Sequence, residues 1–391
     1  MSGAPPLRVA IIAGEESGDL LGADLLRGLA AFSGRTIEPI GVGGAHLQSL
    51  GLKSLFDPGE IALVGISAVV MRLPSLVRRI DTTAKAIAAA APDCLITIDS
   101  PDFTLRVAKK VRAANPSIPI VHYVCPSVWA WRPERARKMA AFVDHVLCIL
   151  PFEVEALKTL QGPPATYVGH RLTHDPDLAA AAERQRARPP LAPGAAPTVL
   201  VLPGSRRSEV KGLLGPFGEA VDILAERGPA PRLLLPTVEH VHELVRQETS
   251  TWRNRPEIIL DRSAKYRAFG EADAAMAASG TVSLELALAR VPTVVSYKLD
   301  PIFRWLVPMI RVWSACLPNL IADRPVMPEF YDSFVRPGML ARLVESFVGD
   351  TPARAAQIEG FDRVAAAMAT DRPAGTLGAE AVMRVLGDSG R

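Results

Sequence analysis

Two aspartates follow an apolar run in the segment LITIDSPDF, residues 95–103. Asp99 and Asp102 are three positions apart, with Pro101 between them, where a buried strand should end. Aspartate and proline are ordinary turn residues, so one interpretation is a simple strand-to-helix turn. The other is a carboxylate at the edge of a cleft that accepts a proton as a general base. The residues alone leave both interpretations open.

A second candidate site is the segment GSRRSEVK, residues 204–211, which follows the apolar run TVLVLP. Gly204 and Ser205 at a strand-to-helix turn would let backbone N–H groups approach an anion at a helix N-terminus. Arg206 adds a guanidinium fork suited to two phosphate oxygens. The spacing is not that of a Walker A loop. A plain capped helix start explains the segment about equally well.

The segment ASGTVSLELAL, residues 278–288, also follows an apolar run. Ser279, Gly280 and Thr281 would form a donor-rich helix N-terminus, and the Glu285 carboxylate one turn later could bridge two ribose hydroxyls. The alternative is a capped helix with a solvated glutamate. Two anion-ready turns in one half of the chain together favour a nucleotide or nucleotide-sugar site there.

An aromatic and basic segment, HYVCPSVWAWRPERARK, covers residues 122–138. Trp129 and Trp131 point the same way if the chain is extended, and Arg132 follows them. Such a segment can hold a sugar face or a phosphate, or lie at a membrane interface. The alternative is a tryptophan-anchored loop over the core. The segment GEESGD (14–19) lacks the glycine and lysine patterns of phosphate loops, so a tight turn is the simpler interpretation.

Two amphipathic apolar stretches, residues 61–80 and 300–313, carry basic and aromatic side chains. Segments of this kind can lie in the lipid headgroup layer, although ordinary core helices explain the same pattern. No uncharged apolar run reaches the ~18 residues needed to span a bilayer, so we expect the chain not to cross a membrane. The candidate membrane-contact residues are Arg72, Arg78 and Arg79 in the first stretch and Arg304, Trp305 and Arg311 in the second.

The elements that must position these residues are short apolar runs separated by helix-length segments. This alternation predicts parallel strands buried on both faces, with helices on each side and ligands beyond the carboxyl ends of the strands. A segment rich in Ala, Pro and Arg, residues 180–198, interrupts the alternation. The predicted strands are 7–14, 37–43, 94–99, 118–124, 145–150 and 165–170 before it, and 198–205, 232–238, 257–261, 274–280 and 291–298 after it.

The length of 391 residues favours two domains, since single cores stop growing at about 250–300 residues. We expect a first α/β domain at 1–180, a linker at 181–197, a second α/β domain at 198–345 and C-terminal helices at 346–391.

The composition indicates a globular chain, with 49% hydrophobic and 22% charged residues. The net charge of +3 is too small to indicate a nucleic-acid binder. The four cysteines, Cys94, Cys125, Cys148 and Cys316, are far apart and form no CxxC pair. They therefore suggest a reducing cytosol and give no sign of a zinc site or a disulfide framework.

Seven segments, in one order from about residue 9 to 330, resemble those of a known family, the lipid-A-disaccharide synthases. HYVCPSVWAWR together with LPGSR is the most specific part of the match. The segments are AGEESGDLLGADLL (13–26), IDSPDF (98–103), HYVCPSVWAWR (122–132), ILPFE (149–153), LPGSRRSEV (202–210), ASGTVSLELAL (278–288) and LPNLIADR (317–324).

The resemblance implies a GT-B glycosyltransferase, with two Rossmann-like domains facing across a cleft and C-terminal helices that could pack back on the first domain. It implies transfer from UDP-2,3-diacylglucosamine to 2,3-diacylglucosamine 1-phosphate. The products would be a β(1→6)-linked disaccharide 1-phosphate and UDP, formed with inversion and without a metal or cofactor. The implied location is cytoplasmic, at the inner-membrane surface. No nucleic-acid partner is implied, and a homodimer is one possible assembly.

Carried over position by position, Asp102 matches the family's candidate general base and Arg206 its functionally important arginine. Asp99 would orient the turn or hold an acceptor hydroxyl. Glu16 and Arg171 depart from the family pattern, which affects fine substrate preference more than the reaction. The donor-binding assignments are Gly204, Ser205, Arg206, Ser279, Gly280, Thr281, Glu285 and Asn319, and the acceptor-side assignments are Glu15, Ser17, Asp19, Trp129, Trp131 and Arg132.

Two other functions fit parts of the pattern. A UDP-sugar 2-epimerase of the same architecture would need acids and bases around the sugar ring and no acceptor pocket. A non-catalytic lipid-binding protein at the membrane surface would explain the apolar basic stretches but would leave both phosphate-ready turns without a role.

Overall fold

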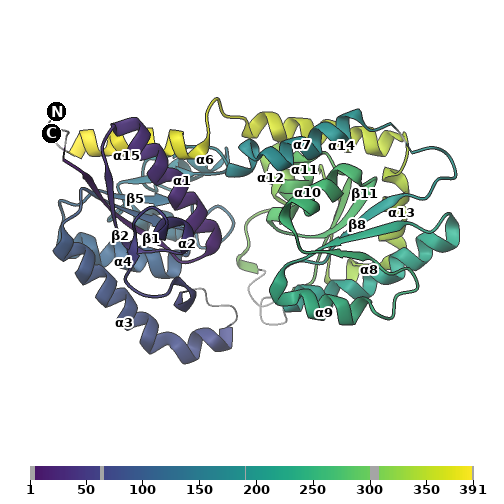
Figure 1. Cartoon of the computed structure of the whole chain (residues 1–391), viewed down its shortest axis with the longest axis horizontal. Helices are drawn as coiled ribbons and strands as arrows, with labels where there is room; N and C mark the ends of the chain where they lie inside the picture. The colour runs from purple at the N-terminus through teal and green to yellow at the C-terminus, as the bar shows by residue number, and fades with distance from the viewer. Residues whose placement is uncertain (1–4, 62–65, 190, 300–307, 390–391) are drawn as a thin grey trace. The chain divides into compact units, whose positions relative to one another are not determined.

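The computed structural model describes residues 5–61, 66–189, 191–299 and 308–389, excluding the side chains of 66–74 and 388–389. The chain forms two compact α/β units (Figure 1). One unit is Met1–Arg171 together with Thr370–Arg391, and the other is Leu172–Ala369. Each unit has its own sheet and its own hydrophobic core.

The first unit is built on a parallel sheet of seven strands in the order β3-β2-β1-β4-β5-β6-β7. Side chains of α1, α2 and α15 bury one face of the sheet, and those of α3, α4, α5 and α6 bury the other. Because both faces are covered, the central strands are continuous apolar runs. The strands are Leu7–Ala13, Ile37–Val42, Lys53–Ser54, Cys94–Ile98, Ile120–Tyr123, His145–Cys148 and Ala165–Tyr167, and the helices are Glu16–Ser33, Ala45–Gln48, Ile66–Ala90, Pro101–Ala114, Glu134–Met139, Glu153–Thr159 and Ala374–Ser389.

The second unit contains a parallel sheet of six strands in the order β10-β9-β8-β11-β12-β13. Helices α8, α9 and α13 cover one face, and α7, α10, α11, α12 and α14 cover the other. The strands β8 to β13 are Thr198–Leu202, Arg232–Pro236, Glu257–Ile259, Ala274–Ala278, Thr293–Tyr297 and Glu329–Tyr331, and the helices α7 to α14 are Pro176–Ala187, Arg207–Arg227, Glu239–Thr249, Arg262–Glu271, Thr281–Leu288, Leu317–Ala322, Pro337–Phe347 and Pro352–Met368.

The strand order reverses beside the first strand of each unit. In the first unit β1 lies between β2 and β4, and in the second β8 lies between β9 and β11. Doubly wound sheets bind ligands beyond the carboxyl ends of the strands at such a reversal. The four strands at the two reversals are followed by the GEES turn, the turn of Asp99, the GSR turn and the SGT turn. Each unit therefore brings two of the sequence motifs together.

The boundaries between the units differ from the predicted ones. Helix α7 was expected to span the end of the first domain and the start of a linker, yet it belongs to the second unit. The Gln185 amide explains this placement, because it donates hydrogen bonds of 2.6 and 2.8 Å to the carbonyls of Phe269 and Ala272 at the end of α10. Helices α13 and α14 also pack within the second unit.

The expected return of the C-terminal helices to the first domain holds for α15 alone. This helix packs along α1 (Figure 1). Gly28 of α1 and Gly375 of α15 come into close contact there. A Cβ on Gly28 would lie 2.3 Å from the carbonyl oxygen of Gly375, so the two backbones are too close for any side chain. The last helix of the chain therefore completes the core of the unit in which the chain begins.

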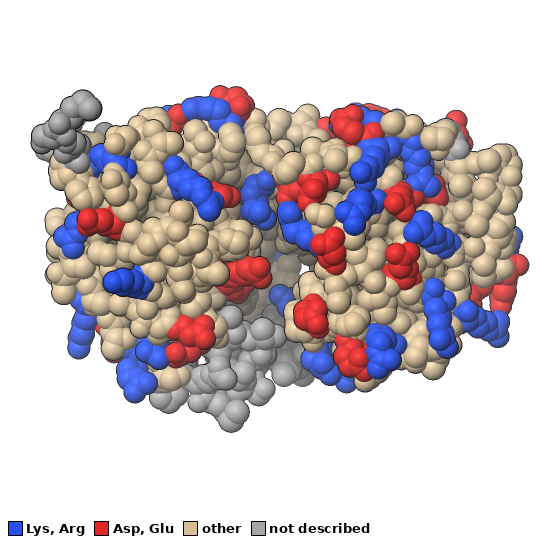
Figure 2. Space-filling model, in the orientation of Figure 1, with Lys and Arg blue, Asp and Glu red and all other residues tan. Residues whose placement is uncertain are grey.

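Basic and acidic side chains are interspersed on the face drawn in Figure 2. This distribution agrees with the small net charge. None of the helices in the described parts of the chain combines the length and the apolar character needed to cross a bilayer.

Candidate active site

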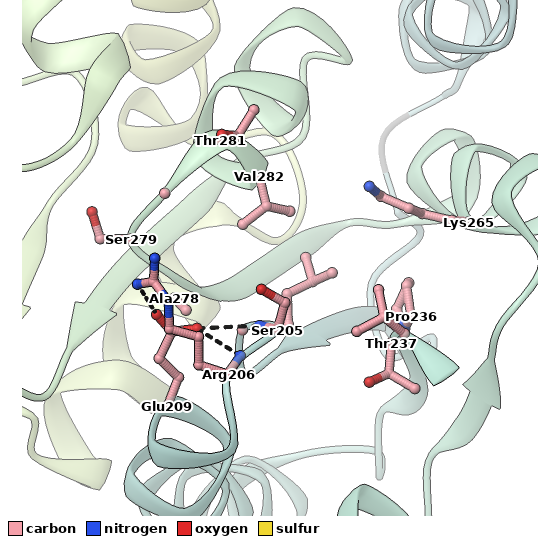
Figure 3. A pocket seen from close by; sticks show the side chains of 14 residues that line it. Ser205, Arg206, Glu209, Pro236, Thr237, Lys265, Ala278, Ser279, Thr281 and Val282 are labelled. Carbon is pink, nitrogen blue, oxygen red and sulfur yellow. Dashed lines mark hydrogen bonds and ion pairs between the residues drawn. The ribbon is translucent and has the colours of Figure 1, made fainter. Parts of the chain in front are cut away.

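A pocket of about 310 Å³ lies at the carboxyl ends of β8 and β11 in the second unit (Figure 3). The turns after these two strands line it together with the end of β9. This is the strand reversal of the sheet, where ligands of doubly wound folds bind. The predicted donor-binding residues that line the pocket are Gly204, Ser205, Arg206, Ser279, Gly280 and Thr281.

The turn after β8 is held by a carboxylate of its own helix. Oε2 of Glu209 accepts the backbone N–H groups of Ser205 and Arg206 at 3.2 Å each, and Oε1 lies 3.1 Å from the Arg206 guanidinium. These two N–H groups are therefore hydrogen-bonded within the turn, whereas the sequence predicted that they would contact an anion. The side chain of Arg206 is 65% exposed and lines the pocket.

Glycine is required in this turn for two reasons. Gly204 has φ +100, a left-handed conformation that residues with a side chain rarely adopt. A Cβ there would also lie 2.3 Å from Oε2 of Glu209. The small residue lets the carboxylate fold back under the turn and fix the position of Arg206.

The turn after β11 is also well ordered by hydrogen bonds. The Ser279 hydroxyl donates to the carbonyl of Ala315 at 3.0 Å, and the Ser283 hydroxyl donates to the carbonyl of Gly280 at 2.7 Å. Thr281 is the first residue of α11 and lines the pocket. The partial positive charge at this helix N-terminus is therefore directed toward the pocket.

Glu285 is not the solvated glutamate of the simpler interpretation. Its side chain is 13% exposed, and its carboxylate forms an ion pair with Lys265 and accepts a hydrogen bond of 3.4 Å from the Tyr266 hydroxyl. Lys265 lies on α10 and lines the pocket, which it reaches from a different element than Arg206 (Figure 3). Two basic side chains thus border a pocket that the sequence predicted to hold a diphosphate.

Asn319 has a structural role in its present position. The side chain is buried, its oxygen accepts the N–H groups of Val326 and Met327 at 2.8 and 2.7 Å, and its nitrogen donates to the carbonyl of Met327 at 3.0 Å. These bonds fix the turn before β13 and leave the side chain away from the pocket lining. The resemblance assigned Asn319 to the donor-binding residues, but in the structure its side chain does not line the pocket.

In the first unit, Asp99 directly follows β4 at the strand reversal. Asp99 and Ser100 have φ values of 49 and 43, and two consecutive left-handed residues without glycine mark a constrained backbone. The Thr104 hydroxyl donates to the carbonyl of Asp99 at 2.6 Å and helps to hold this conformation. Burial raises the pKa of the Asp99 carboxyl above its ordinary value.

Asp102 is in a different environment, although it is only three positions away. It lies in the first turn of α4, its side chain is 73% exposed, and Oδ1 is 2.9 Å from the Arg135 guanidinium. The two aspartates are therefore distinguished by burial and by charge partner.

The GEES turn lies beside Asp99, because a Cβ on Gly14 would be 3.3 Å from the Ser100 hydroxyl. Glu15 and Ser17 are exposed at this turn. Asp19 is buried, and its carboxylate accepts the N–H groups of Gly44, His46 and Leu47 at the start of α2. Asp19 was assigned to the acceptor side, but in the structure its carboxylate caps the start of α2.

The aromatic segment forms turns and is not extended, so its two tryptophans lie in different environments. The indole N–H of Trp129 donates to Oε1 of Glu153 at 3.2 Å, and its ring meets Phe152 edge to face at 5.0 Å. Trp131 is covered by the guanidinium of Arg132 at 4.1 Å. Trp129 anchors the segment, as in the simpler interpretation, while the Trp131 and Arg132 pair is partly exposed.

The candidate membrane residues are only partly within the described structure. Arg79 is tied to Glu60 by two hydrogen bonds of 2.9 and 2.7 Å, whereas Arg78 is exposed. The Arg72 side chain, Arg304 and Trp305 lie outside the described residues. In the second stretch residues 310–313 belong to no helix, contrary to expectation, and Arg311 is exposed there.

Two charged residues of the pocket lining were missed from the sequence. Glu209 is at the position of the acidic residue in a capping box, three residues after the N-cap, but the N-cap is Arg206 where serine or threonine would complete the sequence signal. Lys265 carries no comparable signal, because only the packing of α10 beside α11 brings it to Glu285 and to the pocket.

Comparison with known proteins identifies the chain's relatives. The family model for lipid-A-disaccharide synthetase matches residues 9–346. A lipid-A-disaccharide synthase of Nitrobacter winogradskyi is 45% identical over 390 residues, covering 99% of this chain and 98% of that protein.

Solved structures are similar to the chain at the level of the fold. A glycosyltransferase of kitacinnamycin has a TM-score of 0.62 at 15% identity, covering 97% of this chain and 99% of that one. A UDP-N-acetylglucosamine 2-epimerase from Listeria monocytogenes has a TM-score of 0.58 at 14% identity, with coverages of 97% and 95%. Both a transferase and an epimerase share the fold, so the fold does not separate these two activities.

Proposed function

The chain belongs to the lipid-A-disaccharide synthase family of glycosyltransferases, and from this premise we propose that it joins two diacylated glucosamines. The proposed donor is UDP-2,3-diacylglucosamine and the proposed acceptor is 2,3-diacylglucosamine 1-phosphate. The 6-hydroxyl of the acceptor would attack the anomeric carbon of the donor while UDP leaves from the opposite face. The anomeric configuration inverts, and the product is a β(1→6)-linked disaccharide 1-phosphate.

The observation that carries this proposal is the pocket at the strand reversal of the second unit. It combines the Arg206 guanidinium, the Lys265 ammonium and the N-terminus of α11. Negative charge grows on the diphosphate as the sugar bond breaks, and preorganised positive groups stabilise that charge. We therefore place the UDP diphosphate here, where Glu285 acts from behind the pocket lining by holding Lys265 in an ion pair.

For the general base, the geometry favours Asp99 over Asp102, which reverses the assignment drawn from the sequence. Asp99 lies at the strand reversal of the first unit and has a raised pKa. A base is more effective when its pKa approaches the working pH. Asp102 is committed to Arg135 and would position the start of α4.

We further propose peripheral binding to the cytoplasmic surface of the inner membrane, where both lipid substrates would be found. Met309, Ile310 and Trp313 are 47%, 45% and 54% exposed, and the exposed Arg311 lies among them. Apolar and aromatic side chains beside a basic one suit the boundary between headgroups and acyl chains.

Two other activities remain as outcomes of the test. A UDP-sugar 2-epimerase shares the fold, and a lipid-binding protein would share the exposed apolar residues. Membership of the synthase family favours neither.

The test is mass spectrometry of products after incubation with both proposed substrates. We expect a disaccharide 1-phosphate together with stoichiometric UDP, and an NMR coupling constant that indicates the β configuration. Isomerised UDP-sugar without acceptor consumption would indicate an epimerase. Retention on lipid vesicles without UDP release would indicate a binding protein and would contradict the proposal.

A further inference from the structure

Three side chains able to bind metal ions lie together in the first unit, outside the groups used above. Cys125 follows β5, Cys148 ends β6 and Glu153 begins α6. The two thiol sulfurs and a carboxylate oxygen of Glu153 all lie within 4.8 Å of one another. All three residues are buried, with exposed fractions of 5%, 0% and 2%. The cluster could not be predicted from the sequence, because its members come from three separate segments without CxxC spacing.

The carboxylate of Glu153 is oriented by surrounding donors. Oε2 accepts the N–H groups of Ile149 and Leu150 at 3.1 and 3.0 Å, and Oε1 accepts the indole N–H of Trp129 at 3.2 Å. A carboxylate offers about four lone-pair positions, so one can still face the thiols. Donors of this kind are typical of the outer shell that orients metal-binding side chains.

Two buried thiol sulfurs beside a carboxylate oxygen make a mixed sulfur and oxygen donor set, which suits a borderline-soft divalent cation. A thiol binds such a cation as the thiolate, so its proton is released to solvent when the cation binds.

We propose that Cys125, Cys148 and Glu153 form a binding site for a thiophilic divalent cation of the Zn²⁺ type. A tetrahedral ion with Zn–S bonds of about 2.3 Å needs sulfurs about 3.8 Å apart, so the ligand atoms would converge by at most about 1 Å. Three protein ligands leave the fourth position to water or another small ligand. The ion would connect the ends of β5 and β6 to the start of α6 and fix the segment that carries Trp129.

A further polar atom on the same face of the sheet lacks a hydrogen-bond partner among the described residues. This is Nε2 of His122, whose ring contacts the Thr97 hydroxyl through Nδ1 at 2.8 Å. His122 pairs with Val146 across β5 and β6, and Val146 shares a face with Cys148. The face that carries the thiols thus contains one buried polar atom without a hydrogen-bond partner among the described residues, which is unusual in a purely apolar core.

The test uses the full-length protein, stripped with a chelator and kept reduced with a phosphine. We expect one Zn²⁺ per chain by equilibrium dialysis, and a thiolate-to-metal absorption band when Co²⁺ replaces it. Cys125→Ala and Cys148→Ala should each weaken Zn²⁺ binding more than the ~10–100-fold that losing an outer-shell partner costs. Trp129→Phe, which removes the N–H donated to Glu153, should fall within that ~10–100-fold range.

Cys94→Ala is the matched control, because Cys94 is equally buried but belongs to the other core of the unit. It should leave Zn²⁺ binding unchanged, and circular dichroism of the metal-free variants should confirm that each is folded. The proposal is wrong if the unaltered protein binds no stoichiometric cation, or if both cysteine variants keep it. A Cys125–Cys148 disulfide that forms readily, with no cation bound after reduction, would also overturn it.

Discussion

Asp99 and Asp102 differ in burial and charge partner, and this difference predicts unequal effects of neutralising each one. Asp99→Asn keeps the shape of the side chain but removes its basicity, so kcat should fall by about 10²–10⁴-fold, the usual contribution of a general base. Asp102→Asn removes only an exposed ion pair with Arg135, so a loss below about tenfold is expected. Turnover and UDP affinity should be measured for both variants.

UDP affinity is the internal control in this comparison, because the proposed diphosphate site lies in the other unit. It should be unchanged in both variants. A larger loss of turnover in Asp102→Asn than in Asp99→Asn would restore the assignment made from the sequence.

The raised pKa of Asp99 also predicts a pH dependence. A base acts in its deprotonated form, so activity should rise with pH through the pKa of Asp99 and be lost below it. Because burial raises that pKa, the acid limb of kcat/KM should lie above the range of an ordinary aspartate. This acid limb would be located by measuring kcat/KM for the acceptor as a function of pH at saturating UDP-sugar. A limb at the ordinary aspartate value would exclude Asp99 as the titrating group.

Lys265 contributes a positive charge to the pocket, and its replacement should affect diphosphate binding selectively. Losing a hydrogen bond to a charged group costs about 1.5–3 kcal/mol, so Lys265→Met should weaken UDP binding by about 10–100-fold. Uridine, which lacks phosphate, should bind almost as before. Calorimetric titration with uridine, UMP and UDP would show whether the loss of affinity grows with the number of phosphates.

Arg267→Met is the control for Lys265, because it removes the same charge from the same helix outside the pocket lining. The double variant Lys265→Met with Glu285→Gln tests whether an unpaired Glu285 causes the loss. Equal weakening of uridine and UDP in Lys265→Met would indicate that the lysine acts only by orienting Glu285.

At the scale of elements, the close approach of α1 and α15 predicts a stability effect. Gly28→Ala would place a methyl group 2.3 Å from the Gly375 carbonyl oxygen, and backbone cannot move aside as easily as a side chain. Overpacking of this kind costs about 1–3 kcal/mol in the free energy of unfolding. Urea denaturation would measure it.

Gly387→Ala on α15 is the matched control, because a Cβ there meets nothing within 4 Å. This change should be neutral or stabilise the helix by up to about 1 kcal/mol. Equal stability of the two variants would show that α15 does not pack closely on α1 in solution.

Hydrophobic patterning identified most elements, because strands buried on both faces are continuous apolar runs. All eleven predicted strands are present, whereas Lys53–Ser54 and Glu329–Tyr331 were missed because two or three residues carry no periodic signal. Helix α7 was divided between a domain and a linker, since its packing on α10 depends on distant contacts such as those of Gln185.

Distant contacts, which leave no local sequence pattern, also limited the prediction of the candidate site. Gly204, Ser205 and Thr281 could be found because glycine turns at strand ends are local patterns. Lys265 could not be found, because the fold alone brings it to the pocket. The burial that raises the pKa of Asp99 is likewise a tertiary effect, so local sequence could not separate it from Asp102.

At the scale of the whole molecule, the net charge of +3 gives little general attraction to an anionic membrane. Binding to vesicles should therefore depend mainly on exposed apolar side chains and persist in moderate salt. Replacing Met309, Ile310 and Trp313 with serine removes three of these. Burying a large apolar side chain in the membrane contributes about 1.5–3 kcal/mol to the free energy of binding. The triple variant should therefore bind vesicles at least about tenfold more weakly. Sedimentation with vesicles of zwitterionic and anionic lipid would measure this.

The control removes equally exposed apolar side chains elsewhere, with serine at Phe32, Phe334 and Met339, which are 53%, 67% and 44% exposed. If vesicle binding depends on apolar area alone, both triple variants will lose it equally, and the segment around Arg311 has no special role. If binding is local to that segment, only the first variant loses it. UDP affinity should be the same in both variants, because none of the six residues lines the pocket. Strong loss of binding in salt, with neither variant affected, would instead show that charge attracts the protein to the membrane.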